Sequence, residues 1–235
     1  MLKNSKLEIS ITALLLIAVI LIFQFTEIDI HVQKLFFNFD TLTWIQDREE
    51  PISKFIFYDG IKKVLIAFAF SLLLFLIVFR KKEFLNDYKK GIVLVILSAI
   101  IIPVVVGSLK AVSNVPCPKN IEYFGGTYPN IKAFDPYPKD FIQDKKIKCW
   151  PAGHASGGFA LLALFFLFKK KRNQYLALSF AMIIGWSMGA YKMLIGDHFL
   201  SHTIITMLIA WLIILLIKNL LDLIQRKKFE KPTQI

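Results

Sequence analysis

The feature of this sequence that most restricts its fold is a series of six long blocks of apolar residues with few charges. A block of about 18 or more apolar residues can cross a bilayer as a helix. A helix also satisfies its own backbone hydrogen bonds, which hydrocarbon cannot do. The sequence therefore predicts an all-α integral membrane protein, a bundle of six transmembrane helices in a single membrane domain, residues 1–235. The predicted spans are residues 7–25, 64–79, 91–109, 154–168, 175–195 and 199–217.

The first block, residues 7–25, is expected to stay in the protein as a helix. It is longer than the apolar region of a secretory signal peptide, and no small-residue cleavage site follows it. The composition agrees with a membrane protein, because 56% of the residues are hydrophobic and the mean hydropathy is +0.57. A soluble domain has about 45–50% apolar residues.

Basic residues gather in four of the segments outside the apolar blocks. Residues 1–6, 80–90, 169–174 and 218–235 hold 16 of the 29 Lys and Arg residues and 4 of the 17 Asp and Glu residues. Short loops rich in Lys and Arg stay on the cytoplasmic side, so both termini are expected to be cytoplasmic. This topology, with attraction to anionic lipid, explains the net charge of +12 without a nucleic-acid partner.

The opposite side carries two long loops, residues 26–63 and 110–153. The first loop mixes charged and aromatic residues, which is typical of side chains at the depth of the lipid headgroups. We expect this loop to be a plug on the membrane surface, and contact with a substrate is the alternative. Its aromatic residues include Phe36, Phe37, Phe39, Trp44, Phe55, Phe57 and Tyr58.

The chain has two cysteines, Cys117 and Cys149, and both lie in the loop 110–153. On the outer side of a bacterial inner membrane the compartment is oxidising, so a disulfide would persist there. We expect these cysteines to form a disulfide, which would restrict the loop between them. Two unpaired buried thiols are the alternative.

Three of the four histidines lie in two short polar motifs at the predicted ends of helices. His154 belongs to the motif at residues 149–159, Cys-Trp-Pro-Ala-Gly-His-Ala-Ser-Gly-Gly-Phe. The second motif is Gly-Asp-His-Phe-Leu-Ser-His at residues 196–202, with His198 and His202. Ionisable groups at the ends of membrane helices are costly, and they are therefore candidates for a functional site.

These motifs contain the parts of a phosphate site. The first amides of the helix that begins near Ala152 and Gly153 have no backbone partner and can hold an anion at the positive end of the helix dipole. His198 and His202 are four residues apart, which predicts the same face of a helix. Lys110, at the end of the third predicted span, supplies a compact cation.

The motifs resemble those of the type 2 phosphatidic acid phosphatase superfamily of membrane phosphatases. The family pattern is lysine, six residues and arginine-proline; then proline-serine-glycine-histidine; then serine-arginine, five residues, histidine, three residues and aspartate. This chain has Lys110, six residues and Cys117-Pro118; Pro151 to His154; and Tyr191-Lys192, five residues, His198, three residues and His202. The resemblance covers about residues 90–215 and implies a phosphatase site on the periplasmic side of the membrane.

The chain departs from this pattern at several positions. Cys117 and Lys192 stand where the family has arginines that bind phosphate. His202 replaces the aspartate that orients the nucleophile, and Ala152 replaces a serine. Lys119, Lys132 and Lys148 are candidates for further cations that bind the phosphate.

A branch of the family is more similar to this chain. Phe124-Gly125-Gly126 in the outer loop, Pro-Ala-Gly-His-Ala-Ser-Gly and His-Phe-Leu-Ser-His resemble the bacterial lipid A 4'-phosphatases and related lipid phosphatases. This resemblance implies a bacterial inner-membrane enzyme that removes phosphate from lipid A.

Carried over to this sequence, the resemblance implies a covalent mechanism without a metal or another cofactor. His198 attacks the phosphorus and forms a phosphohistidine. His154 protonates the leaving alcohol and then activates water. His202 fixes the tautomer of His198, and Asp197 is a competing residue for that role. The groups implied in neutralising the phosphate are Lys110, Lys192, the amides at Ala152 and Gly153, and the hydroxyl of Ser156.

Other functions remain open from the sequence. A metal-dependent hydrolase could use His154, His198 and His202, because two histidines at i and i+4 suit zinc. Within the family, the substrate could be an isoprenoid diphosphate or a glycerophospholipid, and a phosphotransferase would need the same site. A non-enzymatic membrane protein would explain the helices but not the three matched spacings. The expected partners are a lipid substrate and the bilayer, and the oligomeric state is left open.

Overall fold

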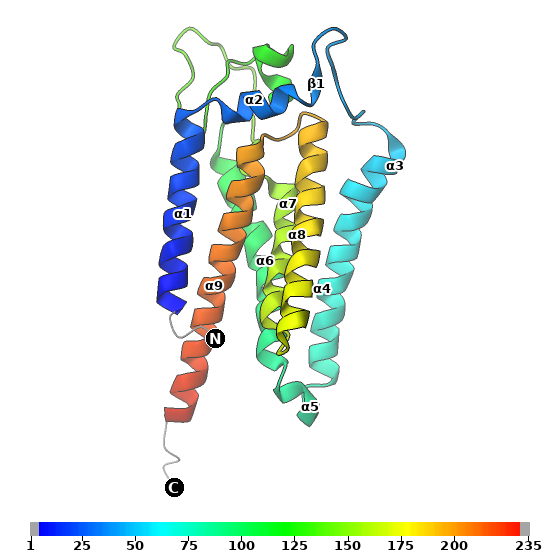
Figure 1. Ribbon diagram of the computed structural model, residues 1–235, viewed down its shortest axis with the longest axis vertical. Helices are drawn as coiled ribbons and strands as arrows, with labels where there is room; N and C mark the ends of the chain where they lie inside the picture. Colours follow the sequence, from blue (N-terminus) through cyan, green and yellow to red (C-terminus); the bar gives the residue numbers. More distant parts are fainter. Residues whose placement is uncertain (1–4, 231–235) are drawn as a thin grey trace.

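In the computed structural model, which describes residues 5–230, long helices form a bundle that is capped at one end by short elements (Figure 1). The long helices are α1 (Ser5–Phe25), α4 (Ile61–Val78), α6 (Lys89–Val112), α8 (Lys171–Leu194) and α9 (Leu200–Glu230). The shorter α-helices are α2 (Ile28–Lys34), α3 (Pro51–Lys54), α5 (Glu83–Asn86) and α7 (Gly153–Ala160). There is one π-helix, η1 (Phe55–Gly60), among the described residues, with 3-10 helices η2 (Pro118–Asn120), η3 (Glu122–Phe124) and η4 (Leu161–Phe166). Strands β1 (Phe37–Asn38) and β2 (Thr43–Trp44) pair antiparallel, with Phe37 opposite Trp44.

Five helices in the described part of the chain are long and apolar enough to cross a membrane. They overlap the predicted spans at residues 7–25, 64–79, 91–109, 175–195 and 199–217. The prediction of a mainly helical protein with several candidate membrane-spanning helices is therefore confirmed, and the two short strands are the departure from an all-α fold. The helices extend beyond most of the predicted bounds, and α9 continues well past residue 217.

The second of these helices begins earlier than the sequence predicts. α3, η1 and α4 form one helical run from Pro51 to Val78, so the prediction of a loop up to residue 63 is wrong. The charges of Lys54, Asp59 and Lys62 interrupt the apolar pattern and conceal this start. Lys62 lines a cavity inside the bundle, so its charge does not need to face hydrocarbon.

The fourth predicted span, residues 154–168, is shorter in the structure. It consists of the 8 residues of α7 and the 6 residues of η4, and this run is not among the five long helices. At about 1.5 Å per residue in α7 and about 2.0 Å in η4, it extends about 24 Å, against about 30 Å for a hydrocarbon core. Its crossing of the membrane stays a prediction.

α7 packs against α6, α8 and α9 in the middle of the bundle. Small residues permit this close approach, as they do between other membrane helices. A Cβ atom on Gly158 would lie 2.8 Å from the Cα of Gly185, and one on Gly185 would lie 2.4 Å from the ring of Phe159. The tight contact between α7 and α8 fixes the start of α7, where His154 lies.

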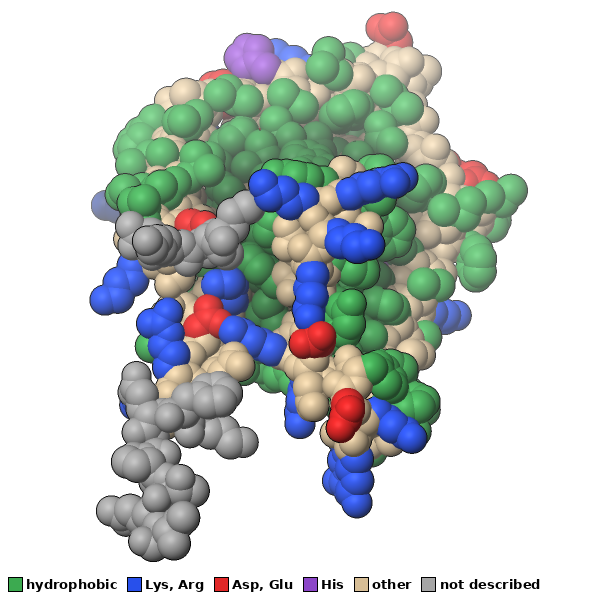
Figure 2. Space-filling model, turned by 60° about the horizontal axis from the view of Figure 1, so that its bottom comes forward, with side chains coloured by type: hydrophobic (Ala, Val, Ile, Leu, Met, Phe, Trp, Pro, Cys, Tyr) green, Lys and Arg blue, Asp and Glu red, His purple; other side chains and the backbone are tan. Residues whose placement is uncertain are grey.

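The two ends of the bundle differ in charge. The first residues of α1 and the last residues of α9 lie toward the end opposite the cap (Figure 1). Basic side chains gather on that end (Figure 2). The connections from α4 to α6 and from η4 to α8 carry Arg80, Lys81, Lys82, Lys169 and Lys170. This arrangement agrees with the expected topology, and the cytoplasmic location of the basic end stays a prediction.

The short elements α2, β1, β2, η2 and η3 form the cap, and an aromatic cluster holds it on the bundle. The ring centroids of Phe37, Trp44 and Phe124 lie 4.8–5.3 Å apart, and Phe199 belongs to the same cluster. Gly196, in the turn between α8 and α9, has a φ of 70°, and a Cβ atom there would lie 2.3 Å from the ring of Trp44. Only glycine allows both this backbone conformation and this contact. The cap therefore rests directly on the turn between α8 and α9.

Asp29 of α2 joins the cap to the first turn of α9. Its Oδ1 accepts a hydrogen bond of 2.9 Å from the N–H of Ser201. Burial raises the pKa of Asp29 from 3.8 to about 6, although the hydrogen bonds from Ser201 act in the opposite direction. The folded protein thus binds a proton where the unfolded chain does not. The free energy of unfolding should therefore fall as the pH rises from about 4 to about 6.

The Asp29→Asn variant is expected to lose this part of the pH dependence, because an amide does not titrate. The free energy of unfolding of the variant should exceed that of wild type by up to about 3 kcal/mol at pH values above the folded-state pKa of Asp29. The difference should vanish at low pH. Apparent melting temperatures in detergent at about pH 4 and about pH 7.5 would measure it. The exposed carboxylate of Asp40 gives a matched control, Asp40→Asn. An Asp29→Asn effect of equal size at both pH values would contradict the assignment.

Candidate functional site

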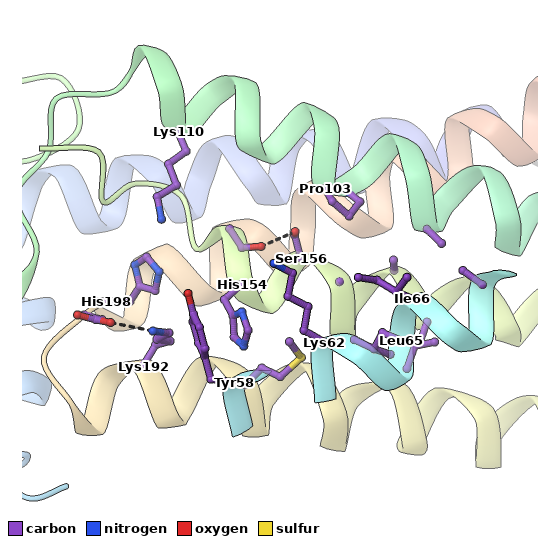
Figure 3. A pocket seen from close by; sticks show the side chains of 18 of the residues that line it. Tyr58, Lys62, Leu65, Ile66, Pro103, Lys110, His154, Ser156, Lys192 and His198 are labelled. Atoms are coloured by element: carbon purple, nitrogen blue, oxygen red, sulfur yellow. Dashed lines mark hydrogen bonds and ion pairs between the residues drawn. The ribbon is translucent and has the colours of Figure 1, made fainter. Parts of the chain in front are cut away.

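Most of the motif residues with candidate roles line a cavity of about 600 Å³ below the cap (Figure 3). Lys110, His154, Lys192 and His198 lie toward one end of the view, and Leu65, Ile66 and Pro103 lie toward the other. The apolar part is lined by α4, α6, α7, η4 and α8, with Leu65, Ile66, Phe68, Ala69, Val95, Ala99, Pro103, Ala160, Leu161 and Met188. The cavity therefore joins a polar end to an apolar channel among the helices.

His198 and His202 form a buried pair at the start of α9. Their exposed fractions are 3% and 2%, and their Nδ1 atoms lie 3.3 Å apart. The prediction that both stand on one helix face is wrong, because α9 begins at Leu200 and His198 lies in the preceding turn. The turn still brings the two rings together, with centroids 5.5 Å apart. His198 lines the large cavity, whereas His202 lines a smaller one beside it.

His198 is held in its neutral form. Burial is the main cause that lowers the pKa of His198 well below its usual value, and the nearby charges of Lys110 and Lys192 act in the same direction. A neutral imidazole has one protonated nitrogen and one nitrogen with a free lone pair. At neutral pH His198 is therefore able to act as a nucleophile.

His154 lies on α7 and is positioned by the π-helix η1. Its Nε2 lies 3.1 Å from the carbonyl oxygen of Phe57, and its ring stacks on the ring of Tyr58 with centroids 4.4 Å apart. A carbonyl oxygen only accepts, so Nε2 of His154 carries the hydrogen of this bond. The other ring nitrogen, Nδ1, is then the one that can exchange a proton with a ligand.

The groups predicted at the start of α7 do not all face the cavity. Gly153 lines it, and the side chain of Lys110 passes beside this glycine, since a Cβ atom there would lie 3.4 Å from Lys110 Cδ. Ala152 is fully buried, and its N–H donates to Thr206 Oγ1 at 2.9 Å. The amide of Ala152 is thus not free to bind a phosphate. Ser156 lines the cavity, but its hydroxyl donates to the carbonyl of Gly153 at 2.6 Å.

Three cations meet on Asp197 at the polar end of the cavity. Lys119 Nζ and Arg48 Nη1 lie 2.6 Å and 3.1 Å from its Oδ1, and Lys192 Nζ lies 2.8 Å from its Oδ2. Among the three extra lysines considered from the sequence, Lys119 lines the cavity. Lys132 instead pairs with Glu27, and Lys148 is exposed and lies outside the cavity lining.

Sequence reasoning missed Arg48, Phe57 and Tyr58. All three belong to the segment that was expected to be a plug on the membrane surface. Tyr58 also lies under the ammonium group of Lys192, 4.0 Å from ring centroid to Nζ. The segment therefore contacts the candidate catalytic residues, and the mixture of charged and aromatic residues was its only signal in the sequence.

A family model for the PAP2 superfamily matches residues 91–226 of this chain. This range is more than half of the chain and contains Lys110 and all three histidines of the site. The chain belongs to the PAP2 superfamily. Members of this superfamily are phosphatases, so the family indicates a phosphatase that acts on lipid-type substrates. Comparisons with curated proteins and with solved structures found no match.

In this PAP2 protein a disulfide joins Cys117 and Cys149, with 2.08 Å between the sulfur atoms. Cys117 stands at a position where a cation would be expected from the motif, and its sulfur cannot supply one. The disulfide holds the segment after α6 against the segment before α7. It thereby places Lys119 beside the turn that carries His198, where the N–H of Lys119 donates to the carbonyl of Gly196 at 3.0 Å.

Cys149, His198 and His202 have possible metal ligand atoms within 4.8 Å of one another. These groups do not fit a metal ion in this PAP2 protein. The Cys149 sulfur is bonded to Cys117 and is therefore not a thiolate, which is the form that binds metals. The two histidines use their Nδ1 atoms for each other. Lys110 and Lys192 would also repel a cation near His198.

Proposed function

We propose that this protein is a metal-independent lipid phosphatase that hydrolyses a phosphate monoester through a phosphohistidine at His198. The observation that carries the proposal is the neutral, buried His198, paired with His202 and placed at the wall of a cavity that also holds several cations. Those cations offer charge-assisted hydrogen bonds to a phosphate. The buried imidazole offers the nucleophile.

The contact between the two histidines supports Nε2 of His198 as the reacting nitrogen. For His198 to attack from Nε2, its Nδ1 must carry the hydrogen and donate it to Nδ1 of His202, 3.3 Å away. The Nε2 lone pair then forms a bond to phosphorus while the bond from phosphorus to the lipid oxygen breaks. His202 accepts the hydrogen bond from the positively charged ring, although a neutral partner stabilises this charge less than a carboxylate would.

His154 supplies the proton transfers. In the first step, the negative charge of the bound phosphate favours the protonated form of His154, which gives a proton from Nδ1 to the departing alcohol oxygen. In the second step, neutral His154 takes a proton from a water molecule whose oxygen attacks phosphorus. The bond from phosphorus to nitrogen then breaks, and inorganic phosphate leaves. Phe57 and Tyr58 keep the imidazole in place for both steps.

The apolar channel supports a lipid as the substrate. A ligand whose phosphate lies among the cations would extend an alkyl chain past Leu65, Ile66 and Pro103. These surroundings are about as apolar as lipid tails, so the alkyl chain can pass from the bilayer into the channel without meeting water. We propose lipid A 4'-phosphate as the substrate on the resemblance of the motifs, in a bacterial inner membrane with the site facing the periplasm.

The test is phosphate release by purified protein in detergent from a panel of lipids, with excess EDTA. The panel holds lipid A, phosphatidic acid, phosphatidylglycerol phosphate and an isoprenoid diphosphate. The proposal expects release that resists EDTA, and the lipid with the highest kcat/KM identifies the substrate. Loss of activity in EDTA would favour a metal-dependent hydrolase. Transfer of label to a second lipid, in place of free phosphate, would identify a phosphotransferase.

A further inference from the structure

The three cations on Asp197 come from three separate parts of the chain. Arg48 lies between β2 and α3, Lys119 lies in η2, and Lys192 lies in the last turn of α8. Both carboxylate oxygens of Asp197 are engaged. Arg48 uses one of its two Nη atoms for this contact, so most of its five N–H donors remain for another acceptor.

The charge around the cavity is far from balanced. Five cationic side chains line it, and Asp197 is the one carboxylate among the described residues that do so. Neither Lys110 nor Lys62 has an ion pair within the described chain. Clustered positive charges repel one another in surroundings of low dielectric constant, so this arrangement favours an additional anion of high charge. A phosphate dianion meets this requirement and offers several acceptor oxygens.

Arg48 is held in position from both sides. On the N-terminal side of Arg48 in the sequence, the N–H of Ile45 donates to the carbonyl of Phe36, and Trp44 packs against Gly196. On its C-terminal side, the side chain of Glu50 accepts hydrogen bonds from the N–H groups of Ile52 and Ser53 in α3, at 3.0 Å and 2.6 Å. The loop that carries Arg48 is therefore anchored over the turn between α8 and α9. Its guanidinium group reaches the cavity although half of the side chain is exposed.

We propose that Arg48 and Lys119 bind the phosphate of the substrate, together with Lys110 and Lys192, and that Asp197 holds Arg48, Lys119 and Lys192 together. Arg48 and Lys119 thus supply positive charge that Cys117, as part of a disulfide, does not supply. The inference rests on the proposed function, because the ligand is the phosphate that His198 attacks. Asp197 is a positioning residue in this arrangement, and its carboxylate keeps the cluster together when no phosphate is bound.

The Arg48→Gln variant is expected to raise KM for the lipid substrate and Ki for orthovanadate about tenfold, with a smaller change in kcat. We expect a tenfold effect, the lower end of the range for the loss of a hydrogen bond to a charged group, because solvent screens the half-exposed Arg48 side chain. Lys119→Gln should have a similar effect, and Arg48→Lys should restore part of the affinity. Lys54→Gln is the matched control, since Lys54 is a nearby cation that pairs with Glu49 and does not line the cavity. Unchanged KM and Ki in Arg48→Gln would overturn the proposal.

A binding measurement separates this proposal from the proposed function. Inorganic phosphate and orthovanadate should raise the apparent melting temperature of the wild-type protein, and Arg48→Gln should need about tenfold more of either anion for the same rise. Equal protection of wild type and Arg48→Gln would refute the role of Arg48 even if the lipids are hydrolysed. Weaker protection of Arg48→Gln, in a protein that hydrolyses none of the lipids, would support the anion site and reject the reaction.

Discussion

The His198→Ala variant is expected to release phosphate about 10⁵-fold more slowly than the wild-type protein, because it lacks the atom that bonds to phosphorus. Loss of the nucleophile has effects of this order in other covalent hydrolases. The side chain removed is buried and hydrogen-bonded to His202, so a destabilisation of about 1–3 kcal/mol accompanies the change. Gel filtration in detergent, beside the phosphate assay, would show that the variant is still folded.

The same variant also tests the covalent intermediate. Wild-type protein mixed rapidly with radiolabelled substrate and quenched in alkali should retain label, because a phosphorus–nitrogen bond withstands alkali and breaks in acid. His198→Ala should retain none. The fourth histidine, His31, is exposed on α2, and His31→Ala is therefore the matched control, with wild-type rate and labelling. Turnover by His198→Ala within about tenfold of wild type would remove His198 from the mechanism.

The long helices could be predicted from the sequence because an apolar block of sufficient length has few other stable structures in a membrane. The start of the second helix could not, because the charge of Lys62 points into a cavity that exists only after the helices have packed. The length and helix type of the fourth predicted span, residues 154–168, could not be predicted either. The switch from α7 to the 3-10 helix η4 depends on close packing against α6 and α8, and the apolar pattern does not record it.

The motif residues could be found from the sequence because each lies at the end of a predicted helix. In an alternating bundle, the end of α6, the start of α7, the end of α8 and the start of α9 fall on one side. Lys110, His154, Lys192 and His198 accordingly line one cavity. The hydrogen-bond partners of Ala152 and Ser156 are set by local geometry at α7, and the motif spacing contains no information about them.

Arg48 and Tyr58 could not be assigned to the site from the sequence, because they belong to no motif. Their approach to the site depends on the path of the cap. The hairpin of β1 and β2 places Trp44 on Gly196, and the chain then passes over Asp197 into α3. The packing between Trp44 and Gly196 links residues 152 positions apart in the sequence. A single sequence does not reveal a contact of this kind.

The His154→Ala variant is expected to hydrolyse a lipid phosphate about 10²–10⁴-fold more slowly than wild type, because an alkoxide leaves poorly without a proton. The loss also removes the group that activates water in the second step. The effect would be measured as kcat/KM on the preferred lipid. His31→Ala again serves as the control, because it removes an exposed histidine outside the cavity.

A substrate with a better leaving group separates the two roles of His154, which are protonation of the leaving group and activation of water. Nitrophenolate departs without a proton, so His154→Ala should form the phosphohistidine from p-nitrophenyl phosphate at a rate near that of wild type. Without a base to activate water, the intermediate should then accumulate. The expected record is a burst of about one nitrophenolate per protein followed by slow turnover, with no burst in His198→Ala. Equal slowing on both substrates without a burst would mean that His154 only supports the site through Phe57 and Tyr58, since such a structural role is insensitive to the leaving group.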